Sequence, residues 1–169
     1  MIVFRKIIFY LFVFMFLLPC PAQAEEVIVQ GPYNINKESS IYIKKEKDEN
    51  FPLGLYLEKN GVSKKIDEYE TNGAIPNVDT VFFMNLDGLK NLIILISWHQ
   101  VHRAENISGT SYQIYGYTFH DGDLNSNKVI TNDPELSGEE GEFYGEEMHF
   151  KYKNAELIKG YLYEKYKVR

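Results

Sequence analysis

The residues best suited to metal chemistry lie at positions 98–103, where His99 and His102 are separated by three positions. Imidazole is a common zinc ligand. Residues three apart on a strand point to opposite faces, so a shared zinc ion would need the strand to end or bulge between them. No Asp or Glu lies at a recognisable ligand spacing, and we therefore expect ordinary strand-end histidines and no metal site.

A second stretch, residues 135–147, is rich in carboxylates and glycine. Glycosidases use a pair of carboxylates, but a catalytic acid needs an apolar pocket that raises its pKa. The stretch offers little apolar sequence beyond Phe143 and Tyr144. The chain also lacks the G-x-S-x-G, H-E-x-x-H and Gly-rich phosphate-loop motifs. The sequence therefore favours a binding protein over an enzyme, and no cofactor is expected.

Tyrosine is the most distinctive residue type, with 13 in the chain. It offers a large contact area and a hydroxyl at low entropic cost, and binding surfaces are rich in it. Sheet preference and helix packing account for most of these tyrosines. Tyr144, beside the acidic stretch, is the one we expect to face a partner. The predicted contact residues are Tyr144, Glu140, Glu142, Glu146, Trp98, His99, His102 and Arg103.

Residues 85–92, NLDGLKNL, resemble the D-x-D-G-x-x-D/E-L turn of calcium-binding repeats of the FG-GAP and integrin-propeller type. That family supplies several carboxylates to the ion. Here Asp87 is the single carboxylate, Asn85 replaces the first Asp, and Leu89 removes a ligand. We therefore expect a hairpin turn without a bound ion.

Hydrophobic patterning predicts the strands that position these residues. Apolar runs at 81–84 and 92–96 flank the bend and predict a central strand pair, and the second run should be covered on both faces because it lacks polar alternation. Residues 53–69 alternate around Asn60-Gly61, the dipeptide favoured in two-residue hairpin turns. Other expectations are strands at 27–29, 40–44 (exposed), 112–120 and 128–131, a break at Gly31-Pro32, and loops at 103–111 and 133–147.

The end of the chain, residues 154–167, predicts one amphipathic helix. Asn154 can cap it, and an apolar stripe follows at spacings of three and four: Leu157, Ile158, Tyr161, Leu162 and Tyr166. The predicted fold is α+β, with an antiparallel β-sheet of about six to eight strands and one C-terminal helix packed on it.

Residues 1–24 have the parts of a secretory signal. Two basic residues precede the uncharged run 7–18, which is shorter than the about 20 residues of a spanning helix. Ala22 and Ala24 give the small-x-small pattern of a cleavage site. We therefore expect cleavage after Ala24, a periplasmic product, and a single domain at residues 25–169.

Cys20 raises a lipoprotein alternative, which Pro19 disfavours because the residue before a lipidated cysteine is small. Without Cys20 the product has no thiol, so packing must stabilise it. The chain has 18 Lys and Arg against 24 Asp and Glu, a net charge of −6, and loss of Arg5 and Lys6 makes it −8. Such acidity argues against nucleic acid or membrane as a ligand and suits a basic protein partner.

Taken together, the signal, the sheet-plus-helix plan and the lack of catalytic motifs are similar to the periplasmic immunity proteins that protect Gram-negative bacteria from type VI secretion toxins. This resemblance implies a binding or inhibitor protein that neutralises a cognate toxin or envelope enzyme through a protein interface. The alternative is a small carbohydrate-binding domain or envelope hydrolase, in which Trp98 and tyrosines would stack on sugar rings.

Overall fold

The computed structural model of the chain describes residues 26–166. The predicted signal, residues 1–24, and the lipoprotein position Cys20 lie outside this part. Within it, no helix has the length and apolar character needed to cross a membrane.

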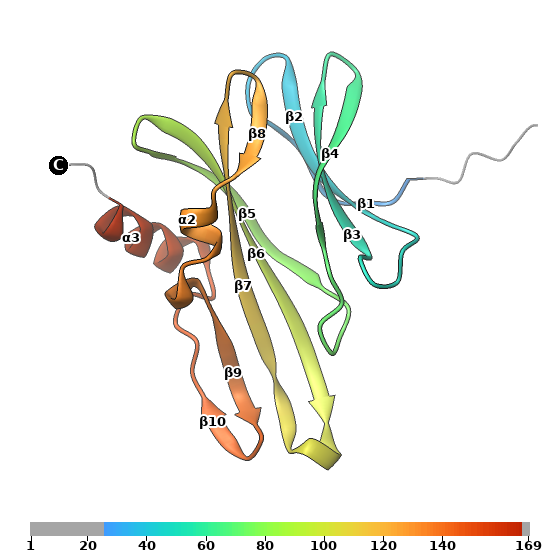
Figure 1. The fold of residues 1–169 in the computed structure, drawn as a ribbon, viewed down its shortest axis with the longest axis vertical. Helices are drawn as coiled ribbons and strands as arrows, with labels where there is room; N and C mark the ends of the chain where they lie inside the picture. Colours follow the sequence, from blue (N-terminus) through green and yellow to red (C-terminus); the bar gives the residue numbers. More distant parts are fainter. Residues whose placement is uncertain (1–25, 167–169) are drawn as a thin grey trace, which may run out of the picture.

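The described residues form ten strands in two antiparallel sheets, followed by a C-terminal helix (Figure 1). Sheet A has the order β1-β2-β3-β4 and contains β1 (Ile28–Asn34), β2 (Ser39–Lys45), β3 (Leu53–Lys59) and β4 (Val62–Tyr69). Sheet B has the order β10-β9-β7-β6-β5, with β8 beside β7, and contains β5 (Asn77–Leu86), β6 (Leu89–His102), β7 (Ile107–His120), β8 (Asp123–Ser126), β9 (Ser137–Phe143) and β10 (Glu146–Met148). The helices are α2 (Lys128–Thr131) and α3 (Ala155–Lys165), with 3-10 turns η2 (Arg103–Glu105) and η3 (Pro134–Leu136). The predicted α+β class, an antiparallel sheet with one C-terminal helix on it, is confirmed.

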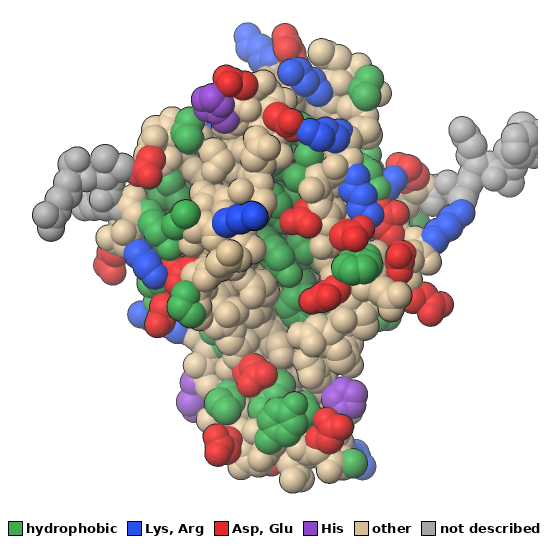
Figure 2. All heavy atoms as spheres, viewed as in Figure 1, with side chains coloured by type: hydrophobic (Ala, Val, Ile, Leu, Met, Phe, Trp, Pro, Cys, Tyr) green, Lys and Arg blue, Asp and Glu red, His purple; other side chains and the backbone are tan. Residues whose placement is uncertain are grey.

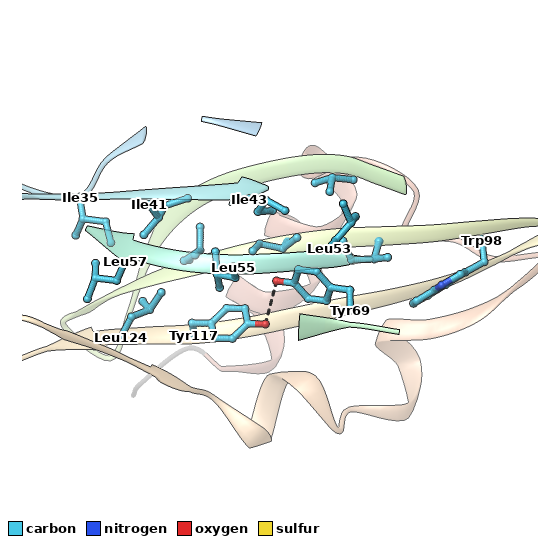
Figure 3. Close-up of a cluster of buried hydrophobic side chains, with 14 residues drawn as sticks. Ile35, Ile41, Ile43, Leu53, Leu55, Leu57, Tyr69, Trp98, Tyr117 and Leu124 are labelled. Carbon is cyan, nitrogen blue, oxygen red and sulfur yellow. Dashed lines mark hydrogen bonds between the residues drawn. The ribbon is translucent and has the colours of Figure 1, made fainter. Parts of the chain in front are cut away.

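Strand β6 lies inside sheet B, and its residues 92–96 are covered on both faces, as the sequence predicts. Leu92, Ile94 and Ile96 face sheet A and join the core between the sheets (Figure 3). Ile93 and Leu95 face the opposite way, toward α3. All five side chains are 0% exposed, so β6 is the strand on which both cores are built.

A hydrogen-bonded chain crosses the core between the sheets. The Tyr117 hydroxyl donates to Asp67 Oδ2 over 2.8 Å, and it lies 3.0 Å from the Tyr69 hydroxyl (Figure 3). Burial raises the pKa of both tyrosines well above the usual value. Both hydroxyls therefore stay protonated and act as donors within the core.

Helix α3 covers the outer face of sheet B. Asn154 caps it as predicted, because its side chain accepts a hydrogen bond from the Leu157 N–H at 3.0 Å. Ile158 and Leu162 are fully buried in the second core. Leu157 was wrongly placed in the stripe: it is 40% exposed, and it lies about 100° around the helix from the buried Ile158.

A buried carboxylate, Asp133, ties this helix to the turn before β9. Its side chain is 1% exposed and accepts hydrogen bonds at 2.9 Å from Lys165, Tyr161 and Tyr166. Burial acts to raise the pKa of the Asp133 carboxyl, but the bonds from Lys165, Tyr166 and Tyr161 outweigh it and hold the pKa below its usual value. The cluster fixes the C-terminal helix on sheet B.

Three local expectations require correction, the first of them because the chain forms a second sheet. Strand β2, expected to be exposed, contributes Ile41 and Ile43 at 0% exposure because sheet A packs on sheet B. Strand β1 continues through Gly31-Pro32 with shifts of register instead of ending there. The loop expected at 103–111 is short, since β7 already begins at Ile107.

Two further segments differ from expectation. Residues 128–131 are helix α2, not a strand; the Asn127 side chain caps it, and Ile130 packs on sheet B above Gly116. The stretch 133–147, expected to be a loop, contains the β9–β10 hairpin. Its Gly138 does not loosen the chain: an added Cβ would lie 2.6 Å from the Phe150 ring, so glycine permits close packing.

The hairpin predicted around Asn60-Gly61 is confirmed, with φ of 52° and 77° at the two turn residues. The bend at 85–91 is also a hairpin turn, but a shorter one than expected. Strand β5 runs to Leu86 and β6 starts at Leu89, so Asp87 and Gly88 alone form the turn, with φ of 52° and 74°.

Candidate functional site

The long strands of sheet B extend past sheet A and past α3, and their far parts form what we call the distal end, residues 98–112 and 137–149 (Figure 1). Pairing between β6 and β7 is continuous from Trp98 opposite Ser111 to His102 opposite Ile107. Strand β9 adds to β7 here, with Glu142 opposite Ser108. The distal end is therefore an ordered sheet that neither the second sheet nor the helix covers fully.

The distal end brings together predicted contact residues that are about forty positions apart in the sequence. Arg103 lies in η2, at the β6–β7 connection, and Tyr144 lies in the β9–β10 turn. The two connections meet because the Gly145 N–H donates to the Asn106 carbonyl at 3.4 Å. At the lower end of Figure 2, hydrophobic side chains are bordered by acidic side chains and by histidines.

Tyr144 is the most exposed large hydrophobic residue at this end, at 71%. With Gly145 it forms the turn between paired residues Phe143 and Glu146. Its φ is 54°, in the left-handed region, where a bulky L-residue is rare and costs about 1–2 kcal/mol. The other non-glycine residues with positive φ are Asn60, Asp87, Asn106 and Asp121, whose short polar side chains tolerate this conformation.

The remaining glutamates of the predicted site differ from one another. Glu142 and Glu146 are exposed on either side of the turn. Glu140 accepts a hydrogen bond from the Phe150 N–H at 2.8 Å and pairs with Lys153 at 2.6 Å. Two interactions lower the pKa of Glu140: the hydrogen bond with Lys153, which has the larger effect, and the hydrogen bond from the Phe150 N–H. Glu140 is thus engaged in holding the chain after β10 against the sheet.

The two histidines of β6 lie on opposite faces, because the strand is regular through both. The His99 Nδ1 lies 3.2 Å from the Thr110 hydroxyl, while the His102 Nε2 lies 3.3 Å from the Gly73 carbonyl. Among residues 26–166, no group of three or more His, Cys, Asp or Glu is arranged to hold a metal.

Trp98 must be corrected as a direct contact residue. Its side chain is 4% exposed, and its indole N–H donates to the Glu70 carbonyl at 2.9 Å. A side chain that is 4% exposed leaves too little of the ring open to stack on a sugar, so the carbohydrate hypothesis loses its anchor. Trp98 instead fixes the chain after β4: Gln100 donates to the Asn72 carbonyl at 3.1 Å in the same segment.

A cleft of about 550 Å³ opens between this segment and the distal part of sheet B. Its lining combines carboxylates, hydroxyls, amides and aromatic rings: Glu70, Asn72, Trp98, Ser111, Tyr112, Gln113, Tyr115, Ser137, Gly138, Glu139, Met148 and His149. Burial, with the nearby Asp67 and Glu70, raises the pKa of Tyr115 to about 12. Tyr115 therefore presents a neutral hydroxyl to the cleft.

The cleft was not predicted, although the sequence contains one signal for it. The core-facing positions of β6 and β7 are apolar or aromatic until Trp98 and Tyr115, and then become Gln100, Gln113 and Ser111. Such a change along one face of a strand indicates where the core ends. The missing information was the fold-back of residues 70–73, which forms the opposite wall.

No protein-family model, curated protein or solved structure matches this chain. Function must therefore be inferred from the geometry of the distal end.

Proposed function

We propose that this protein is an exported binding or inhibitor protein, of the kind that immunity proteins represent, and that it docks on a partner protein through its distal end. The turn at Tyr144 carries the proposal. Asn at this position would give the favoured Asn-Gly turn that the chain already uses at Asn60-Gly61. A tyrosine accepts backbone strain here while it stays 71% exposed, which supports a role outside the fold.

The surroundings of Tyr144 suit a basic protein partner. Glu142 and Glu146 flank the ring and are exposed, so a cationic surface would meet them as the ring is buried. Exposed tyrosines surrounded by polar groups are frequent centres of binding energy. We propose that a cognate toxin or envelope enzyme is held here and inhibited without chemistry by this chain.

The first experiment is co-expression with the product of the neighbouring gene. Rescue of the cells from its toxicity, together with a stable complex, is the expected result. Absence of both, or turnover of peptidoglycan by the purified protein alone, would refute the proposal and favour the hydrolase alternative.

The second experiment replaces Tyr144 with Asn. The change relieves the left-handed tyrosine, and we expect stability to rise by about 1 kcal/mol and the melting temperature by about 3 °C. Affinity for the partner should fall at least about thirtyfold, the loss typical of a central aromatic contact. Because the variant is the more stable protein, unfolding cannot explain the lost binding.

A matched control is available in Tyr163→Ala. Tyr163 is 50% exposed on α3, away from the distal end, and its removal should leave affinity unchanged. Equal affinity of the Tyr144→Asn variant and the wild type would remove the distal turn from the interface.

A further inference from the structure

The cleft beside residues 70–73 has acidic groups on two different elements. Glu70 follows β4 of sheet A, and Glu139 lies on β9 of sheet B. Neither takes part in an ion pair within residues 26–166. The Glu139 side chain is half-buried, and a carboxylate partly removed from water interacts more strongly with an incoming cation.

Neutral hydrogen-bond acceptors complete this lining. The Gln113 amide N–H groups donate to the carbonyls of Ile114 and Thr131, at 3.1 and 3.0 Å, and its amide oxygen takes no part in these bonds. Ser111, whose hydroxyl already accepts a hydrogen bond from Gln100 at 3.1 Å, and Ser137 line the same space. Carboxylates and several oxygen acceptors around one cavity match the flat, five-donor fork of a guanidinium group better than a compact ammonium.

One border of the cleft is a strand edge. Within the described residues, Ser137 to Glu140 pair with β7 on one side, and β10 pairs with β9 only from Gly141 onward. The chain after β10 moves to the outer face, where the Phe150 N–H binds the Glu140 carboxylate. The edge of β9 beside the cleft therefore has no strand neighbour, and such an edge can accept an extended peptide.

We propose that the cleft binds an extended, arginine-bearing segment of a protein partner, which pairs with the edge of β9 and places one guanidinium group between Glu70 and Glu139. This inference rests on the proposed function and identifies the chemistry of a second contact with the same partner. The anchored segment 70–73 and the paired strands fix the backbone that carries both glutamates before binding, which lowers the ordering cost.

The chain provides its own reporter, because Trp98 is its single tryptophan and lines the cleft. The probe is an acetylated Thr-Arg-Thr-Arg-Thr amide, titrated against the full mature protein while tryptophan emission is recorded. We expect a saturable change. Citrulline in place of both arginines, and N-methylation of alternate backbone amides, should each weaken binding about tenfold or more, because the first removes the charge of the guanidinium groups and the second removes backbone hydrogen bonds.

Variants test the same site from the side of the protein. Glu139→Gln and Glu70→Gln keep the shape and remove one charge each, and each should weaken peptide binding about tenfold, the loss of one charge-assisted contact. Glu156→Gln, at an exposed position on α3, should not change it.

Two results would overturn the inference. One is an unchanged emission at about 5 mM peptide, since a dissociation constant above that value is weaker than a specific contact of this kind. The other is equal binding of the citrulline peptide. A response to chitin oligosaccharides without a response to the peptide would also overturn it. Failure here is separable from failure of the proposed function. If the Glu139→Gln protein keeps full affinity for the cognate partner while the Tyr144→Asn protein loses it, the cleft inference falls and the docking surface stands.

Discussion

The hydroxyl chain between the sheets permits a double-mutant test with an asymmetric outcome. A carboxylate only accepts, so the Tyr117 proton goes to Asp67, and Tyr69 must donate its own proton to the Tyr117 oxygen. The order of donation is therefore Tyr69 to Tyr117 to Asp67. Tyr69 is 0% exposed and Tyr117 is 1% exposed, so water cannot replace a lost partner.

The two single variants should differ in cost. Tyr117→Phe removes a bond to a charged acceptor and leaves the buried Tyr69 O–H without an acceptor, for a total of about 3 kcal/mol. Tyr69→Phe removes one neutral bond and leaves only an unfilled lone pair on Tyr117, for about 1 kcal/mol. The double variant removes the orphaned hydroxyl as well, so its cost should be about 2 kcal/mol, below the sum of the singles.

Urea unfolding followed by the emission of Trp98 measures all four proteins, because Trp98 belongs to the same core cluster (Figure 3). Constant slopes in the transition would show that the variants alter stability and not the extent of unfolding. Equal costs for the two single variants would refute the deduced order of donation. A double variant that costs the full sum would refute the coupling.

Three other changes, the first with an exposed control, test helix α3 and the outer face of sheet B. Asp133→Asn should cost about 2 kcal/mol at pH 7, while Asp121→Asn, at a side chain that is 86% exposed, should cost little. Because the pKa of Asp133 is lowered in the folded protein, its contribution to the free energy of unfolding is present above the ordinary carboxyl pKa of about 4 and is lost as the pH falls below that value. The urea midpoints of the wild type and D133N should therefore converge in acid. Midpoints that stay equally far apart at every pH would contradict this. Gly138→Ala, with Cβ 2.6 Å from the Phe150 ring, should cost about 2 kcal/mol, whereas Gly160→Ala, with no atom within 4 Å, should gain about 1 kcal/mol from helix propensity; thermal melts measure both.

The parts of the fold that could be predicted are those specified by local chemistry. Asn60-Gly61 fixes a turn by its backbone preference, and Asn154 caps a helix by its side chain. The unbroken apolar run of β6 requires cover on both faces, whatever supplies that cover. None of these features depends on knowing which distant segment lies opposite.

The parts that failed depend on distant partners. The alternating pattern of β2 predicts a half-exposed strand as long as the second sheet that faces it is unknown. The glycines of β9 suggest a loop because sequence alone cannot show that Phe150 packs against Gly138. The candidate site shows the same division: Tyr144 and its glutamates could be chosen by residue type, whereas the wall that residues 70–73 build across the cleft depends on the Trp98 and Gln100 hydrogen bonds.

The energetics of Tyr144 connect the fold to the proposed role. A left-handed tyrosine costs the free protein about 1 kcal/mol or more. The ring is 71% exposed, and covering that area of a tyrosine would yield about 3 kcal/mol at 25 cal/mol per Å² of apolar surface. Val101, on the outer face of β6 in the same distal end, is also 55% exposed and would add to this gain. Under the proposed docking, this gain would exceed the cost in the free protein, so a tyrosine at this turn would be favourable for a protein that acts while bound and unfavourable for one that acts alone.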